Sequence, residues 1–197
     1  MKSFGSGGPA FEELVSRARD GDEDAFAALW RHFHPGLVRY LRVVARDDAH
    51  DLASEVWLAV VRGLGNFSGD ELGFRAWIFT IARHRAADAG RRRSRRIADT
   101  VSLTDEDLPD GADPAAEAAA RIELGACLRL LRSLPRSQAD VIALRVIGGL
   151  SVAQTAATIG KSEGAVRVLA HRGLDHLRAQ LSAELTSRRR DEPTAVA

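Results

Sequence analysis

Apolar residues recur at intervals of three and four along most of this chain, the spacing that predicts amphipathic α-helices. Between residues 11 and 44 the pattern supports two or three helices, with a break near Gly21, and we expect Pro35 to open or kink the last of them. The other helical patterns cover residues 47–64, 74–96, 121–134, 137–150 and 150–181. No convincing alternation of period two is present, so the sequence predicts an all-α protein.

Residues 150–181 carry the clearest signals for helix starts and stops. Ser151 followed by Gln154 has the spacing of a capping box, Gly160 supplies a stop, and Ser162 is placed to cap a second helix. The apolar positions of that second helix form one stripe that we expect to be buried, made of Val166, Ala170, Leu174, Leu177 and Leu181. Two such helices joined by a short turn indicate a helix-turn-helix.

The opposite face of this second helix combines positive charge with apolar side chains, as contact with a DNA major groove requires. Its residues are Arg167, Val168, Leu169, His171 and Arg172. An ordinary helical hairpin with a solvated basic face shows the same pattern. This stretch by itself therefore leaves both interpretations open.

Charge is strongly segregated along the chain, although the formal net charge of the 197 residues is only +1. Residues 91–96 read RRRSRR, whereas residues 97–120 contain several carboxylates and no Lys or Arg. We interpret 97–116 as an acidic flexible linker between two small helical bundles at 11–96 and 117–185, flanked by a flexible leader (1–10) and a flexible tail (186–197). A solvated helix end followed by a disordered linker accounts for the same charge pattern without assigning it a function.

The helix predicted near residues 47–64 has an acidic outer face. Asp48, Asp51 and Glu55 follow one another at intervals of three and four, so like charges repel unless water or a basic partner compensates them. Both a solvated face and a docking face fit this pattern.

Aromatic residues lead into arginines in the region that follows. The turn-rich loop at 65–73 holds Phe67, which must pack inward or contact something flat, and the next helix passes from Phe74 and Trp77 into Arg83 and the arginine run. A surface of this kind suits nucleic acid, since it holds backbone phosphates while stacking unpaired bases.

Enzymatic chemistry is not indicated by any motif. The chain has no Gly-rich phosphate loop, no nucleophile elbow and no clustered metal ligands, so we expect neither a metal nor another cofactor. His32 and His34 lack acidic or cysteine partners at ligand spacing, which favours packing or solvent exposure, and Cys127 fits a core filler better than a reactive thiol. No apolar run of membrane-spanning length and no secretory signal are present, so we expect a cytoplasmic protein without membrane insertion.

In order and spacing these segments resemble the extracytoplasmic-function sigma factors, the small two-domain group (group 4) of the bacterial sigma-70 family. The resemblance is carried by three segments and spans nearly the whole chain. They are DAHDLASEVWLAV, NFSGDELGFRAWIFTIARHRAAD and LPRSQADVIALRVIGGLSVAQTAATIGKSEGAVRVLAHRGLDHLR. The resemblance implies a non-enzymatic transcription initiation factor, which binds core RNA polymerase and directs promoter recognition and melting. The alternative is a stand-alone helix-turn-helix regulator.

The resemblance also implies a role for each charged face. The acidic helix would dock on the polymerase clamp in the beta-prime subunit through Asp48, Asp51, Ser54 and Glu55, and the family usually has Gln at the position of Ser54. The loop at 65–73, with Phe67, would hold a flipped base of the minus-10 element, with Trp77 mostly structural. The remaining minus-10 contacts would come from His84, Asp88, Arg91 and Arg92, and many relatives have Asn at the position of His84.

For the minus-35 element the resemblance implies Ser162, Arg167, Val168, Leu169, His171 and Arg172. Relatives commonly have a basic residue at 167, a small polar one at 168 and Arg at 169, so Val168 and Leu169 favour contact with thymine methyls or readout of DNA shape. The implied partners are the beta-prime clamp and beta flap of core polymerase, promoter DNA and an anti-sigma factor, which could hold the cytoplasmic protein at the membrane. The acidic linker would thread the polymerase cleft.

Overall fold

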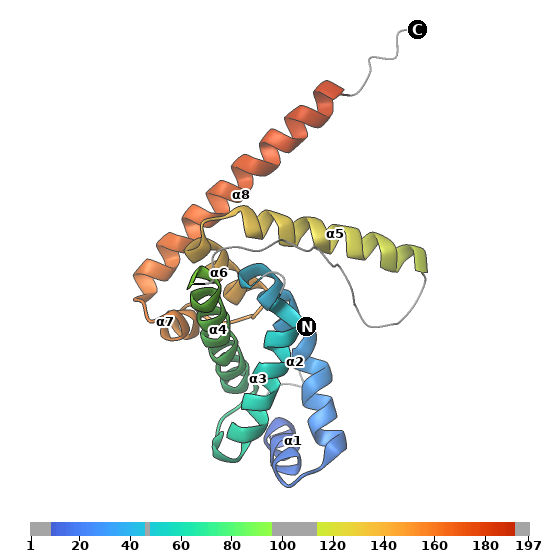
Figure 1. Cartoon of the computed structure of the whole chain (residues 1–197), viewed down its shortest axis with the longest axis vertical. Helices are drawn as coiled ribbons and strands as arrows, with labels where there is room; N and C mark the ends of the chain where they lie inside the picture. The colour runs from blue at the N-terminus through green and yellow to red at the C-terminus, as the bar shows by residue number, and fades with distance from the viewer. Residues whose placement is uncertain (1–8, 46–47, 96–113, 192–197) are drawn as a thin grey trace.

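The structure, a computed structural model, describes residues 9–45, 48–95 and 114–191 (Figure 1). Within these ranges the regular elements are helices and none is a strand, which confirms the all-α prediction. They are α1 (Pro9–Arg19), α2 (Glu23–Val44), α3 (Ala49–Gly63), the short 3-10 turn η2 (Leu64–Asn66), α4 (Glu71–Arg95), α5 (Pro114–Ser133), α6 (Arg136–Val146), α7 (Val152–Ile159) and α8 (Glu163–Asp191). Most of the predicted acidic linker lies outside the described residues.

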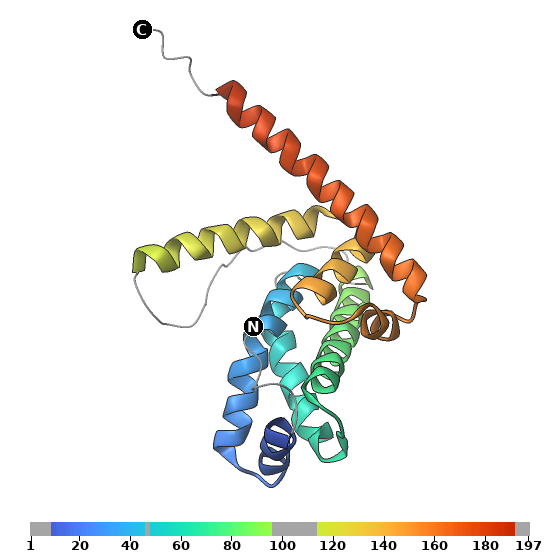
Figure 2. The same cartoon turned by 180° about the vertical axis from the view of Figure 1, so that it is seen from behind.

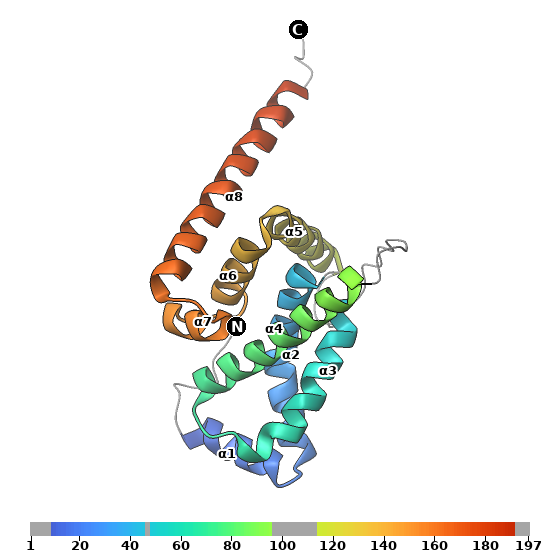
Figure 3. The ribbon, with the colours of Figure 1, turned by 60° about the vertical axis from the view of Figure 1, so that its left-hand side comes forward.

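Helices α1–α4 form the first bundle, in which α2 packs against α1, α3 and α4 (Figure 3). Aromatic side chains fill its centre, where the rings of Phe11, Phe33 and Phe74 lie with centroids 6.4, 5.6 and 5.1 Å apart in their three pairs. Each of these residues is at most 1% exposed. Because aromatic rings bury large apolar areas and attract one another edge to face, this cluster anchors the helices that carry the charged faces.

Pro35 lies inside α2, which runs from Glu23 to Val44, so the expectation that it opens a helix was wrong, whereas a kink at this residue stays a prediction. A proline in a helix interior removes one hydrogen bond to the carbonyl four residues earlier. That carbonyl belongs to Arg31, a residue exposed to solvent. Phe33 and Leu37, almost fully buried on either side of Pro35, hold the helix on the core.

A charged network lies inside the first bundle, where the sequence pattern gave no indication of it. Glu71 and Arg75 are only 5% and 7% exposed. One oxygen of Glu71 accepts hydrogen bonds from Arg75 at 2.6 Å and from His32 at 3.2 Å. The Arg75 guanidinium also lies over the ring of Phe33, 5.3 Å from its centroid. His32 is thus a packed residue, as the sequence favoured over metal binding.

Stability is expected to fall as the pH drops below about 6.5, because burial lowers the pKa of both His32 and His34. His34 Nδ1 accepts a hydrogen bond from Trp57 Nε1 at 3.2 Å, which a protonated ring cannot do. A histidine whose folded-state pKa is below its unfolded value stabilises the fold fully above the unfolded pKa, and this contribution is lost as pH falls.

Chemical denaturation at several pH values between 7.5 and 5.5 would measure this dependence. The variant His34→Asn replaces the accepting ring nitrogen with an amide oxygen, which accepts a hydrogen bond but does not titrate, so it should show a shallower slope than the wild type. A free energy of unfolding that rises on acidification in this range would contradict the assignment.

Helices α5–α8 form the second bundle, and its end signals agree with the sequence. Ser151 and Gln154 make the reciprocal bonds of a capping box, and Gly160 adopts a left-handed conformation (φ 65°) at the end of α7. The Ser162 hydroxyl accepts from the amide of Ala165 at 3.2 Å, so it caps α8 as predicted. The helix-turn-helix geometry is therefore confirmed from α7 to α8.

The apolar stripe of α8 is only partly buried. Val166 is 1% exposed, but Leu174 and Leu181 are 42% and 44% exposed, so the prediction of one continuous buried stripe was wrong beyond the first turns. The close contact with α6 is instead made at Gly173, where an added Cβ would lie 2.5 Å from Ile142 Cδ1. After further contacts of His176 with Gln138 on α6 and of Gln180 with Ser133 on α5, the end of α8 projects away from the rest of the molecule (Figure 2).

Several predicted boundaries and roles differ in the structure. Helix α5 begins at Pro114, inside the predicted linker, and α8 continues to Asp191, inside the predicted tail. Cys127 is exposed rather than a core filler, because it lies on the outer side of α5 next to buried Leu128. Ser137 and Asp140 have the spacing of a capping pair, but the N-cap of α6 is Pro135, and Asp140 bonds to Tyr40 of the first bundle.

The two bundles are packed together rather than separated. Helix α2 contacts α5 and α6, and α4 contacts α7, so α6 and α7 lie beside the upper part of α2 and α4 (Figures 1 and 3). The sequence gave no indication of this arrangement, since each bundle has its own apolar stripes.

Candidate functional site

The outer face of α3 combines acidic and apolar side chains. Asp51 and Ser54 are exposed, and one or two turns further along the same face Leu58 and Val61 are 56% and 55% exposed. Sequence reasoning missed these two apolar residues. The available signal was that neither belongs to the buried stripe of α3, which includes Leu52, Val56 and Val60.

The basic end of α4 relieves part of the charge repulsion on α3. Arg93 pairs with Asp48 at 2.8 Å, and Arg85 lies 3.8 Å from Glu55. The compensating charge that the acidic face requires is therefore partly supplied within the chain. Asp51 and Ser54 lie outside these pairs, and the Ser54 hydroxyl donates to the backbone carbonyl of His50 at 3.2 Å.

The loop before α4 is held by an aromatic stack. Phe67 is partly buried and stacks on Trp77, with ring centroids 5.2 Å apart and an interplanar angle of 23°. Arg19 fixes the loop backbone by donating to the carbonyl of Phe67 at 2.5 Å and to that of Leu64 at 3.3 Å. Of the two alternatives for Phe67, the structure shows it packed inward, with Trp77 as its supporting ring.

The predicted minus-10 residues of α4 share one helical face. His84, Asp88, Arg91 and Arg92 follow at intervals of three and four, and His84, Arg91 and Arg92 are exposed. Asp88 forms an ion pair with Arg91 one turn away. The exposed guanidinium groups of Arg91 and Arg92 lie at one end of this face, and His84 is the exposed group at its start.

On α8 the predicted minus-35 residues divide into two groups. Arg167, Val168, His171 and Arg172 are exposed and lie on one side of the helix. Arg167 pairs with Glu163 at 2.7 Å and His171 with Asp175 at 3.3 Å, both in the same helix. Leu169 is half-buried, packs against the apolar core and lines a cleft between the bundles, which sets it apart from the exposed group.

The structure therefore shows three exposed faces on three helices: an acidic and apolar face on α3, a basic face on α4, and on α8 the face that carries Arg167, Val168, His171 and Arg172. Among the residues described, no cluster of His, Cys, Asp or Glu could hold a metal ion. Likewise, no described helix is both long enough and apolar enough to span a membrane. An all-helical fold that pairs a basic helix supported by aromatic rings with a helix-turn-helix is typical of DNA-binding transcription proteins.

Comparison with known proteins gives the family. The Sigma-70 region 2 model matches residues 24–96, and the Sigma-70, region 4 model matches residues 124–177. The chain belongs to the sigma-70 family and is an RNA polymerase sigma factor of the extracytoplasmic-function (ECF) type.

Individual relatives agree with this assignment. The chain is 37% identical over 177 residues to the ECF RNA polymerase sigma factor ShbA of Streptomyces griseus, covering 84% of this chain and 92% of that one. It is 34% identical over 182 residues to the ECF RNA polymerase sigma factor SigD of Mycobacterium tuberculosis, covering 89% and 86%.

Among solved structures, CnrH in complex with the cytosolic domain of CnrY has a TM-score of 0.62 at 26% identity, covering 89% of this chain and 99% of that one. The sigma factor RpoE of Bartonella quintana, solved with the anti-sigma factor NepR, has a TM-score of 0.63 at 22% identity, covering 80% and 96%. The likeness to RpoE shows the fold alone.

Proposed function

We propose that this sigma factor divides polymerase binding and promoter reading among the three helical faces described above. The single observation that carries the proposal is the exposure of Asp51, Ser54, Leu58 and Val61 on one face of α3, outside both bundle cores. A face that mixes carboxylates with uncovered apolar side chains suits a protein partner carrying basic and apolar groups. That partner is the beta-prime clamp of core polymerase.

The minus-10 element would be melted and held by the first bundle. Phe67, packed inward on Trp77, fixes the backbone of the loop that would hold an unstacked base, and Arg91 and Arg92 supply positive charge further along α4. His84 and Asp88 on the same face would contact the strand between them. Trp77 would act through Phe67, as a support rather than as a direct contact.

The minus-35 element would be read by α8. Arg167, Val168, His171 and Arg172 are exposed to a major groove, and Ser162 at the start of the helix is placed near the phosphates. Val168, at 49% exposed, would touch thymine methyls. Leu169 would contribute by fixing the helix-turn-helix against its core.

The partners would include the beta flap, which we assign to the second bundle, and an anti-sigma factor. The support for an inhibitor is that CnrH was solved in complex with the cytosolic domain of CnrY. We expect the protein to act in the cytoplasm, where polymerase and promoter DNA are, and to catalyse no reaction itself. An anti-sigma factor anchored in the membrane would hold this sigma factor at the membrane surface.

Transcription in vitro with purified core polymerase tests the proposal. Addition of this protein should produce transcripts that start at a defined distance from a cognate promoter, and core polymerase alone should not. Duplex binding by the isolated protein with no effect on core polymerase would instead favour a stand-alone regulator.

Arg167→Ala is expected to weaken binding of the holoenzyme to its promoter by about 1–3 kcal/mol, because an arginine in the major groove reads a base edge. Its ion pair with Glu163 is exposed and weak, so DNA can displace it readily. Arg178→Ala is a matched control, since Arg178 also lies on α8 with a neighbouring carboxylate as partner. Equal promoter affinities for the two variants, measured by fluorescence anisotropy, would exclude a base-reading role for Arg167.

A further inference from the structure

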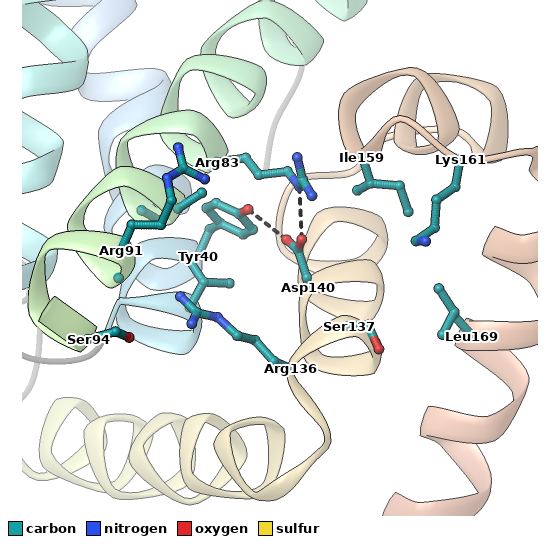
Figure 4. A pocket seen from close by; sticks show the side chains of 14 residues that line it. Tyr40, Arg83, Arg91, Ser94, Arg136, Ser137, Asp140, Ile159, Lys161 and Leu169 are labelled. Carbon is teal, nitrogen blue, oxygen red and sulfur yellow. Dashed lines mark hydrogen bonds and ion pairs between the residues drawn. The ribbon is translucent and has the colours of Figure 1, made fainter.

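A cleft lies among α4, α6 and the turn between α7 and α8 (Figure 4). Its volume is about 680 Å³, within the range of roughly 300–1,000 Å³ that small-molecule sites occupy. Cationic side chains line it from three elements, with Arg83 and Arg91 on α4, Arg136 on α6 and Lys161 in the turn. The cleft therefore gathers positive charges that are far apart in the sequence.

Asp140, the carboxylate that lines the cleft, is already compensated. One of its oxygens accepts a hydrogen bond from Arg83 Nε at 3.0 Å, and the other accepts from Tyr40 Oη at 2.8 Å. Arg91 forms an ion pair with Asp88, as described above. Arg136 and Lys161, by contrast, form no ion pair with any residue that the structure describes. The positive charge of these two side chains is left for another anion.

Arg136 extends across the cleft toward α4. Its guanidinium lies against Gly90, where an added Cβ would be 2.7 Å from one of the guanidinium nitrogens. Glycine is an unfavourable residue inside a helix, and at this position it leaves the room that the guanidinium occupies. Arg136 and Lys161 are both exposed, so a ligand in the cleft can reach them from solvent.

The rest of the cleft wall is largely apolar, with two hydroxyl groups. Its apolar side chains include those of Val44, Ala86, Ala87, Ile159 and Leu169. The hydroxyls belong to Ser94 and Ser137. Small-molecule sites commonly have this composition, in which an apolar lining holds the ligand and a few polar or charged groups orient it. An inorganic anion would use only the charged groups, whereas a molecule with both phosphates and an apolar ring system would use the whole cleft.

We propose that this cleft binds a nucleoside polyphosphate, with Arg136 and Lys161 holding the phosphates and the apolar wall beside Leu169 receiving the nucleoside. Guanidinium and ammonium groups bind phosphate oxygens through short, charge-assisted hydrogen bonds. Because the two cations come from separate elements, they can hold two phosphate groups of one ligand. The site is built by the free chain alone, so this inference goes beyond the proposed function and is tested without polymerase or promoter DNA.

Isothermal titration calorimetry of the full chain with ATP tests the site. EDTA keeps divalent cations from competing for the phosphates, and an ionic strength of about 0.15 M screens weak attraction between exposed charges. We expect saturable binding of one ATP per chain. Lys161→Ala and Arg136→Ala should each weaken it by about tenfold or more, because each removes a charge-assisted hydrogen bond.

Arg178→Ala is the matched control for these two variants. Arg178 is an exposed arginine of α8 that pairs with Asp175 in the same helix and does not line the cleft. Its replacement removes the same charge from the chain and should leave ATP affinity unchanged, and thermal melting checks that all three variants fold. The proposal fails if the wild type does not bind ATP, or if Arg178→Ala weakens binding as much as Lys161→Ala does, since equal losses indicate attraction by net charge alone.

Pyrophosphate and adenosine separate the two parts of the ligand. We expect both to bind more weakly than ATP, because each uses only part of the cleft. Pyrophosphate binding as tightly as ATP would overturn the role of the apolar wall in holding a nucleoside. Adenosine binding as tightly as ATP would overturn the phosphate contacts of Arg136 and Lys161.

Protection of a thiol locates the ligand. Ser137 is exposed and lines the cleft, whereas the exposed thiol of Cys127 on α5 does not line it. In the Ser137→Cys protein, ATP at about ten times its Kd should slow alkylation of the introduced thiol by iodoacetamide about tenfold, in proportion to the fraction of empty sites. Alkylation of Cys127, followed in the same sample by mass spectrometry, should keep its rate. An unprotected thiol at position 137 under saturating ATP would place the nucleotide elsewhere and overturn the assignment.

Discussion

Replacing Glu71 by alanine is expected to lower the free energy of unfolding by about 3–5 kcal/mol, the usual cost of removing one partner from a buried ion pair. The carboxylate is 5% exposed and accepts hydrogen bonds from both Arg75 and His32. Removal of this carboxylate withdraws the negative charge that compensates the guanidinium of Arg75, a residue that is itself only 7% exposed. It also leaves a space beside that guanidinium, which lies over the ring of Phe33.

Chemical denaturation of the full chain would measure this loss. Glu71→Gln, which keeps the hydrogen-bonding oxygen but not the charge, should fall between the wild type and the alanine variant. Glu12→Ala, at an exposed glutamate of α1, should change the free energy of unfolding by less than about 0.5 kcal/mol. A loss below about 1 kcal/mol for Glu71→Ala would mean that water reaches the pair and that the network is not a structural centre of the bundle.

Leu58→Arg is expected to weaken binding to core polymerase by at least about 2 kcal/mol, or roughly 30-fold, without loss of stability. The side chain is 56% exposed and lies between Ser54 and Val61 on the α3 face that we assign to the clamp. An arginine there replaces an apolar contact with a cation. If the clamp surface is basic, as the carboxylate of Asp51 suggests, like charges also meet.

Leu72→Arg is the matched control, since Leu72 is 55% exposed but lies at the start of α4, away from the α3 face. Binding of each variant to core polymerase without DNA can be followed by fluorescence anisotropy, and thermal melting checks the fold. Equal losses for both variants, or none for Leu58→Arg, would move the docking surface away from α3.

The sequence alone determined the local features of this protein. The helices, the capping box at Ser151, the stop at Gly160 and the cap at Ser162 follow from short-range patterns, because helix ends need particular side chains within three or four residues. The order of the acidic, aromatic and basic segments indicated the family, which the comparisons then established. The exposure of Arg167, His171 and Arg172 also followed from helical periodicity.

Only the tertiary structure decided which charges are compensated and which surfaces are covered. Helical periodicity predicts that charged residues are solvated, so it could not place Glu71 and Arg75 in a core. It also could not predict that Asp140 of α6 accepts a hydrogen bond from Tyr40 of α2. It assigned Leu174 to a buried stripe, although the close approach at Gly173 is where α8 meets α6. These outcomes depend on contacts between residues up to 100 positions apart, and helical periodicity carries no information about such pairs.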